Sequence, residues 1–388
     1  MIRKFLYAVC TALVSTGMLH AGFDSARDPF VLGFMGITHW RETDLQTLAK
    51  LGVNYIHNYS SWRWNDPEAR LDLAAKYKMK VMFDLGAHSR INKKEDPDWE
   101  KNVPALVKRL DSHPALGIWY LWDEPATRRL PELRKLNTLV KAAGKSPTGL
   151  CMNEREEYWN TRGYSDIWMF DNYPVRGEVY PAAPLKWHSR AMRNAAASYN
   201  YKGTPFFAVV QACDFSCFKY NIKNEEQLKN LRFPNVKELR FMLFSDLCYG
   251  IRGFWFFSYH HMHLERAEGR AYFNDTLIPC LAEVRDFLKL VPDPWNVTLR
   301  HSSKLDIANK VSFACFTRNG QSTIVLVNDS PEKCDLKVDG TAFPAMPVSG
   351  KLVPWNFTSK PGKLENKVLT VLQAEPWEVF VWQVKSKD

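Results

Sequence analysis

The sequence predicts an α/β protein, a (β/α)8 TIM barrel followed by a small antiparallel β-sandwich domain. Eight short apolar runs alternate with amphipathic helical segments over about 270 residues, which is the size of such a barrel. The runs are continuously apolar rather than alternating, as expected for parallel strands that are buried on both faces. After residue 293 the helical pattern stops, and short alternating runs separated by turn residues begin.

The expected elements follow in order along the chain. Barrel strands are expected at 31–38, 55–58, 81–85, 116–121, 148–152, 166–170, 206–211 and 253–258. Helices are expected at 42–50, 67–77, 99–110, 130–143, 185–199, 236–249 and 277–290, and sandwich strands at 311–317, 323–328, 333–338, 368–372 and 379–384. A doubly wound sheet would need a G-x-G-x-x-G turn after its first strand. Residues 36–40 read Gly-Ile-Thr-His-Trp instead, which favours the barrel.

The chain begins with the pattern of a secretory signal peptide. Arg3 and Lys4 precede an apolar run over residues 5–19, and Ala21 supplies a small residue at the cleavage point. The run is too short to span a membrane comfortably. We therefore expect cleavage after residue 21, export to the periplasm or the medium, and no integral membrane segment in the mature protein. The barrel domain is expected at 22–293 and the sandwich at 294–388.

The composition narrows the class of partner. The net charge of +10 would permit nucleic acid, but the basic residues are scattered over segments such as 128–145 and 219–237. They form no stripe with stacking aromatic residues, so a nucleic-acid partner is not expected. Seven of the eight cysteines follow the leader without a C-x-x-C pair, so neither a metal nor another cofactor is expected. The 14 Trp, 15 Tyr and 23 Phe are the more informative feature.

Polar and aromatic residues gather where the expected strands end. Active sites of such barrels lie at the C-terminal ends of the strands. Sugars present apolar C–H faces to aromatic rings and hydroxyls to carboxylates and amides, so this mixture predicts a carbohydrate substrate. The residues expected to contact it are His39, Trp40, His57, Tyr59, Trp62, Asp84, Trp122, Glu154, Asn172, Tyr173, Gln211, Asp214, Trp255, Tyr259 and His260.

The sharpest motif is Trp-Tyr-Leu-Trp-Asp-Glu-Pro over residues 119–125. Pro125 ends the fourth strand directly after Glu124, which leaves that carboxyl at the barrel mouth. Neighbouring indoles would desolvate the carboxyl and raise its pKa, which suits a proton donor to a departing sugar oxygen. The alternative role is an acid that caps the following helix.

On these residues the chain resembles the barrel glycoside hydrolases of the clan that carries an acid/base glutamate at the end of strand four, followed by proline. The resemblance covers the strand order, the segment 119–125 and the sandwich, whose segment 375–381 is similar to the closing strand of many such domains. It is to the clan and not to one family. It implies an exported glycoside hydrolase that cleaves a poly- or oligosaccharide, with Glu124 as general acid/base.

Two positions depart from this clan. Asp123 stands where the clan usually has asparagine, and residues 209–211, Val-Val-Gln, lack the nucleophilic glutamate of strand seven. A second catalytic group is still needed, and three solutions are open. Asp171 as nucleophile or base is the first choice, and Asp214 or Glu154 is the second. In the third, the substrate's own N-acetyl group attacks, oriented by Asp123, as an adjacent Asp-Glu is similar to what hexosaminidases carry.

Two other classes of function remain open from the sequence. The missing strand-seven glutamate also fits a barrel that binds glycans without cutting them. Asp84, Asp123 and Glu124 could instead hold Mg²⁺ in a nuclease or phosphoryl-transfer barrel, although the indoles at the strand ends argue against it. The sugar, the linkage and the stereochemical outcome are not determined by the sequence.

Overall fold

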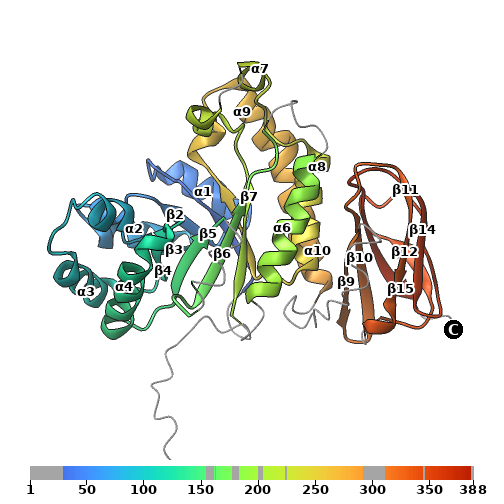
Figure 1. Ribbon diagram of the computed structural model, residues 1–388, viewed down its shortest axis with the longest axis horizontal. Coiled ribbons are helices and arrows are strands. Elements are labelled where there is room, and N and C mark those ends of the chain that lie inside the picture. Colours follow the sequence, from blue (N-terminus) through green and yellow to red (C-terminus); the bar gives the residue numbers. More distant parts are fainter. Residues whose placement is uncertain are drawn as a thin grey trace, which may run out of the picture.

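The computed structural model describes residues 29–153, 161, 163–176, 183–199, 204–222, 225–291, 311–343 and 346–385. Within them a closed parallel barrel of eight strands is followed by two antiparallel sheets (Figure 1), so the predicted fold class is confirmed. The expected signal peptide, the expected boundary at 293/294 and Glu154 lie outside the described residues. Within the described ranges, no helix has both the length and the apolar character that crossing a bilayer requires.

Each barrel strand pairs in parallel with the next, and β8 returns to β1. The strands are β1 (Val31–Phe34), β2 (Tyr55–Asn58), β3 (Lys80–Asp84), β4 (Leu116–Asp123), β5 (Thr148–Met152), β6 (Ile167–Asn172), β7 (Phe206–Gln211) and β8 (Gly253–Phe257). The helices are α1 (Glu42–Lys50), α2 (Pro67–Lys76), α3 (Trp99–Leu110), α4 (Leu130–Ala143), α6 (Ala183–Tyr199), α7 (Glu225–Lys229), α8 (Val236–Cys248), α9 (Ala267–Ala271) and α10 (Ile278–Leu290). The segments after β7 and β8, which carry α7 and α9, lie at the top of Figure 1. They mark the mouth of the barrel, which is the opening at the C-terminal ends of its strands.

Strand side chains alternate between the barrel interior and the layer beneath the helices. Met82 and Met169 lie inside, whereas Phe83 and Phe170 lie in the outer layer. The interior is filled by side chains and is not a pore. Gly33 shows how tight the filling is, because a Cβ there would lie 2.5 Å from the indole of Trp255.

The second domain is a sandwich of two antiparallel sheets, with strand orders β12-β15-β10-β9 and β11-β14-β13. Its strands are β9 (Val311–Arg318), β10 (Gln321–Asn328), β11 (Cys334–Asp339), β12 (Lys351–Pro354), β13 (Lys363–Glu365), β14 (Val368–Ala374) and β15 (Val379–Lys385). The sequence patterns did not predict β12 and β13. Both are short edge strands, too short to show a clear period of two.

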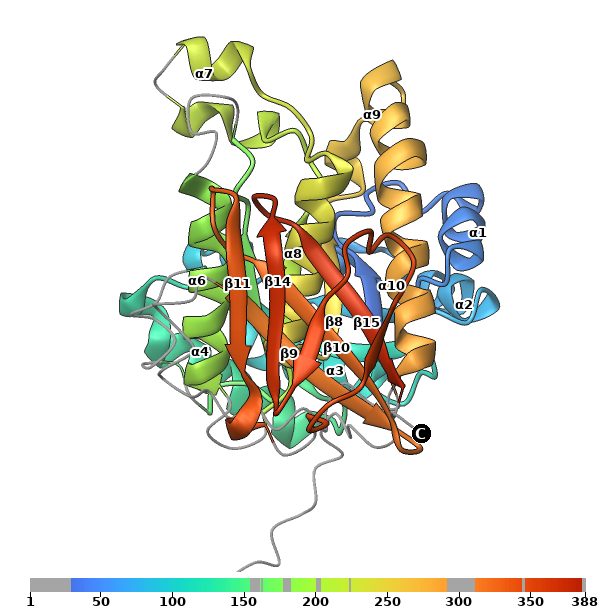
Figure 2. The ribbon, with the colours of Figure 1, turned by 90° about the vertical axis from the view of Figure 1, so that its right-hand side faces the viewer.

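Helix α8 joins the two domains. It is buried along most of its length and lies between the barrel and the sandwich strands β9, β10 and β15 (Figure 2). The ring of Phe241 on α8 meets the edge of Trp377, with centroids 5.1 Å apart. Tyr249, which directly follows α8, shares a 2.8 Å hydrogen bond with Ser312 of β9. The sandwich is therefore packed on the barrel and not merely tethered to it.

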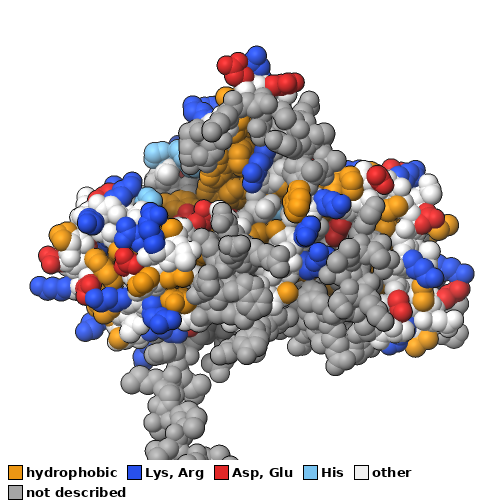
Figure 3. All heavy atoms as spheres, in the orientation of Figure 1, with side chains coloured by type: hydrophobic (Ala, Val, Ile, Leu, Met, Phe, Trp, Pro, Cys, Tyr) orange, Lys and Arg blue, Asp and Glu red, His pale blue; other side chains and the backbone are white. Residues whose placement is uncertain are grey.

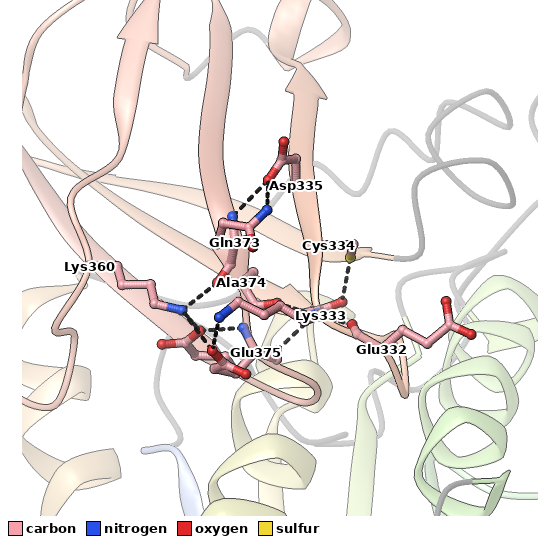
Figure 4. Close-up of polar contacts among 10 residues, drawn as sticks. Glu332, Lys333, Cys334, Asp335, Lys360, Gln373, Ala374 and Glu375 are labelled. Carbon is pink, nitrogen blue, oxygen red and sulfur yellow. Dashed lines mark hydrogen bonds and ion pairs between the residues drawn. The ribbon is translucent and has the colours of Figure 1, made fainter.

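A polar cluster organises one end of the sandwich, around the start of β11 and the end of β14 (Figure 4). Lys333 forms an ion pair with Glu375 at 2.7 Å. Lys360 donates a hydrogen bond to the carbonyl of Gln373 at 2.5 Å, and the amide of Gln373 donates to Asp335 at 2.8 Å. Because these groups bond one another within the sandwich, the cluster has a structural role.

Candidate active site

Four acidic side chains come together at the mouth of the barrel. They are Asp84 of β3, Asp123 at the end of β4, Glu124 directly after it, and Asp171 of β6. Asp84 and Asp171 are buried, with 7% and 6% of their surface exposed. A side-chain hydrogen bond joins Asp171 to Glu124, and the charge of Asp171 acts on Asp123. The structure thus brings the first-choice pair of the sequence prediction into direct contact.

Burial raises the pKa of the acids on β3 and β4. It raises the pKa of Asp84 to about 8, helped by the charge of Asp123 and opposed by the amide of Gly86, which donates to Asp84 at 2.9 Å. Burial and the charge of Asp171 raise the pKa of Asp123 to about 7. They do so although the hydroxyl of Tyr120 donates to Asp123 at 2.6 Å. Both acids therefore carry a proton part of the time at neutral pH.

Asp171 is the most enclosed member of the cluster. Burial raises its pKa, while hydrogen bonds from Glu124, Tyr173 and Cys151 favour the ionised form and oppose that rise. Its Oδ1 atom is buried and has no hydrogen-bond partner among the described residues. A carboxyl with this mixture of neighbours can accept a further donor or react with an atom placed before it.

The surroundings of Glu124 differ from the prediction. Its side chain is exposed, and it does not cap α4, which begins at Leu130 after Arg129. The predicted desolvation by indoles is wrong, because Trp119 and Trp122 both lie in the outer layer. A register shift between Tyr120 and Trp122 turns Trp122 outward, so the prediction that Trp122 contacts substrate is corrected as well.

Aromatic rings form a wall beside Asp171. Tyr173 stacks on Phe257 and on Phe218, with centroids 4.9 and 5.6 Å away. Tyr59 meets the edge of Phe257 at 6.4 Å. Tyr59 and Tyr173 were expected here from the sequence, whereas Phe218 and Phe257 were not. Phe257 ends an apolar strand, and such a run of phenylalanines gives no indication of which ring reaches the mouth.

A pocket of about 510 Å³, with a mixed polar and apolar lining, lies on the β1 and β8 side of the mouth. Its lining includes the predicted residues His39, Tyr259 and His260. The hydroxyl of Tyr259 donates to Asp44 at 3.1 Å, and Thr38 Oγ1 lies 3.3 Å from His260 Nδ1. Figure 3 shows a recess with hydrophobic side chains below α7, flanked by histidine side chains. Further lining residues, which the sequence patterns did not indicate, are Ile37, Thr38, Arg41, Asp44, His263, Leu264 and Glu265.

Four predicted contact residues are buried and have structural surroundings instead. Trp255 is fully buried in the barrel interior, below the level at which a ring could support a sugar. His57 is also fully buried beneath Tyr59, and burial lowers its pKa to about 3. Trp40 packs edge-on against Trp64 at 4.7 Å.

Gln211 is the fourth of these residues. Its amide bonds the backbone of Val175 at 2.8 and 2.7 Å and the carbonyl of Cys213 at 3.1 Å. These bonds hold the segment that follows β6 against the end of β7. A glutamine fully used in this way cannot take the place of a strand-seven nucleophile.

Three predicted residues remain near the rim. Trp62 is half-buried, with the guanidinium groups of Arg63 and Arg90 at 4.6 and 4.9 Å from its ring centroid. Asn172 follows Asp171 and is half-buried. Asp214 accepts hydrogen bonds from the amide and hydroxyl of Ser216 at 2.9 and 2.6 Å, so its carboxyl is engaged in a turn.

The described part of the chain contains no evident metal-binding site. There, no group of three or more His, Cys, Asp or Glu side chains is arranged to hold a metal ion. The histidines around the pocket bond local partners instead: Ser258 Oγ lies 2.7 Å from His261 Nδ1, and Glu265 lies 3.2 Å from His263 Nδ1.

Comparisons with known proteins agree on the fold. No protein-family model matches the chain, and no curated protein matches it in sequence. Among solved structures it is similar to a Bacteroides fragilis protein provisionally assigned as an alpha-galactosidase/melibiase, with a TM-score of 0.60, 12% identity, and coverage of 92% of this chain and 79% of that one. An Anoxybacillus alpha-amylase gives a TM-score of 0.53 at 10% identity, covering 89% of this chain and 90% of that one.

A third similar structure is a glutamate-to-glutamine variant of AmyP in complex with maltotriose, with a TM-score of 0.54, 12% identity, and coverage of 94% of both chains. At these identities the likeness is one of fold. The fold of this chain is thus similar to that of solved structures named as alpha-amylase or as a provisional alpha-galactosidase.

Proposed function

We propose that the protein is an exported glycoside hydrolase that cleaves a poly- or oligosaccharide at the mouth of the barrel. Glu124 is the general acid that protonates the departing sugar oxygen, and Asp171 is the second catalytic carboxyl. The observation that carries the proposal is the hydrogen-bonded pair of Asp171 and Glu124, one buried and one exposed, at the C-terminal end of the strands.

The chemistry follows from how two neighbouring carboxyls share protons. Two acids in contact do not both ionise readily, so the ionisation of one raises the pKa of the other. In the proposed mechanism Glu124 carries the proton, because its hydrogen bond favours the ionised form of Asp171. Glu124 can then act as acid from the open side and Asp171 as nucleophile or as the base for water once the substrate has separated them, because these reactions need the two carboxyls about 5–5.5 Å or about 6.5–9.5 Å apart.

Asp123 supports a second version of the same activity. Its pKa near 7 and its bond to Tyr120 let it either donate to or accept from a substrate amide. In this version Asp123 orients an N-acetyl group that attacks in place of Asp171. The two versions differ in substrate, because only the second requires an N-acetyl sugar.

The decisive experiment measures hydrolysis of a panel of 4-nitrophenyl α- and β-glycosides of glucose, galactose and N-acetylglucosamine, and of the matching oligosaccharides. The wild type is compared with Glu124→Gln and with Glu365→Gln, an exposed glutamate on β13 of the sandwich. We expect Glu124→Gln to lose about 10²-fold or more of kcat, the contribution of a general acid, and the control to retain full activity.

Each result has a clear meaning. Turnover that survives in Glu124→Gln removes Glu124 as the acid. Oligosaccharide binding by the wild type without any turnover favours a glycan-binding barrel. Turnover confined to the N-acetyl sugar, lost in Asp123→Asn, selects the substrate-assisted version.

A further inference from the structure

We propose that the pocket between β1 and β8 is a distal subsite that holds a second, uncharged sugar unit, so that the substrate is an extended neutral oligosaccharide. This inference rests on the proposed function and names the substrate class of the same site. The pocket has about 510 Å³ of volume, within the range of small-ligand sites. It is lined by residues from the segments after β1 and β8, together with Asp44 of α1.

The pocket and Glu124 lie on different sides of the mouth, with Asp171 of β6 between them in the strand order. Glu124 follows β4, whereas the pocket belongs to β8 and β1. In the closed ring of eight strands, β4 and β8 are four positions apart and face each other across the barrel. A ligand bound at both places must therefore be longer than one sugar ring.

A continuous series of rings connects the two places. Tyr173, which bonds Asp171, stacks on Phe257 at 4.9 Å. The ring of Phe257 lies 5.5 Å from that of His261, and His261 lies 5.2 Å from His260. His260 lies 6.3 Å from His39, at the pocket. This series leads from the carboxyl pair through β8 to β1. Tyr173 and Phe257 are nearly buried, so the rings that a sugar can reach are those of His261, His260 and His39 towards the pocket, and such rings can pack against its C–H face.

The charges in the pocket favour an uncharged ligand. Arg41 forms an ion pair with Asp44 at 3.0 Å, and His263 is 3.2 Å from Glu265. The guanidinium of Arg41 thus has an acidic partner, and Glu265 adds a second carboxylate to the lining, so the described lining residues have no excess of positive charge to attract a uronate or a phosphate. What the pocket offers to a ligand is a set of donors and acceptors around Tyr259 and His260, which suits hydroxyl groups.

The test compares substrates of different length. We would measure kcat/KM for the 4-nitrophenyl monoglycoside that the wild type cleaves, for the matching neutral hexasaccharide, and for a uronate-containing oligosaccharide of similar length. The variants are His260→Ala and Asp44→Asn, with His88→Ala as a control, an exposed histidine after β3 that does not line the pocket. We expect each pocket variant to lower kcat/KM for the hexasaccharide at least about tenfold more than for the monoglycoside, the effect of losing one or two hydrogen bonds.

Three outcomes would overturn the inference. An equal loss on both substrates, or no loss on either, would remove the pocket as a subsite while leaving the proposed hydrolase intact. A wild-type preference for the uronate substrate would contradict the uncharged ligand. Absence of turnover by the wild type on every substrate would overturn the proposed function itself, and the subsite with it.

Discussion

Buried acids occur in two regions of this protein, and their neighbours differ. At the seam between the domains, Asp246 of α8 lies 2.8 Å from His188 of α6, and both side chains are almost fully buried. Nearby, Asp329 of the sandwich accepts a 2.8 Å hydrogen bond from Ser312. At the barrel mouth, Asp84, Asp123 and Asp171 have one another and Glu124 as neighbours.

The comparison shows that burial alone does not indicate function. Burial raises the pKa of Asp246 at the seam, as it does that of Asp171 at the mouth. At the seam the acid faces a base on another helix, so the contact fastens elements together. At the mouth acids face acids, an arrangement that raises the pKa values of Asp84 and Asp123 and is common at functional sites. Removing one acid from each region tests this difference.

The largest effect is expected from Asp171→Asn. Removal of the carboxyl that we propose as the second catalytic group should lower kcat by about 10³-fold, within the range for acid–base groups, and no change of pH should restore it. The stability of the folded state, in contrast, should stay the same or increase. A raised pKa in the folded state means that the stability contributed by this group is full at low pH and is lost as pH rises through the folded pKa. At a pH of about 8, well above the ordinary pKa of an aspartate, the variant should therefore unfold at an equal or higher urea concentration than the wild type.

Urea unfolding at that pH checks the predicted stability, and initial rates on the same preparation check the predicted loss of kcat. If the variant loses activity and unfolds at a clearly lower urea concentration, Asp171 stabilises the fold as Asp246 is expected to do. The proposed difference between the two regions is then wrong.

The second effect is expected from Asp246→Ala at the seam. The change leaves His188 buried without its partner, which should cost about 3 kcal/mol of the free energy of unfolding. The kcat of the folded fraction should stay close to that of the wild type, because the seam lies away from the mouth. Asp275→Ala, an exposed acid in the segment after α9, is the matched control and should leave the unfolding midpoint unchanged. Lost kcat at full folding would couple the seam to the site and contradict the account.

Much of the barrel could be predicted from the sequence, because each strand is a continuous apolar run and such runs are long enough to recognise. The predicted strand 253–258 matches β8, and the helix 130–143 matches α4. The acidic cluster could also be predicted, since Asp84, Asp123 and Asp171 each fall where a parallel strand ends.

The orientation of individual rings could not be predicted. One irregularity in β4 turns Trp122 into the outer layer, because a shift of one residue exchanges the two faces of a strand. Trp255 lies too deep in the barrel interior, opposite Gly33 on a strand distant in sequence. Gln211 has the position of a rim residue, but its partner Val175 comes from another loop. Each of these outcomes depends on long-range packing that no local pattern contains.

The measurement that tests the central claim most directly is a pH titration of the carboxyl carbons by ¹³C NMR, with Asp and Glu labelled, in the wild type and in Asp84→Asn and Asp123→Asn. With pKa values of about 8 and about 7 for Asp84 and Asp123, the wild type should show carboxyl resonances that titrate near neutral pH. Each variant should lose one of them. If both variants keep every neutral-range resonance, or if all carboxyls of the wild type titrate below about pH 5, near the ordinary range, the mouth does not retain protons and the account is contradicted.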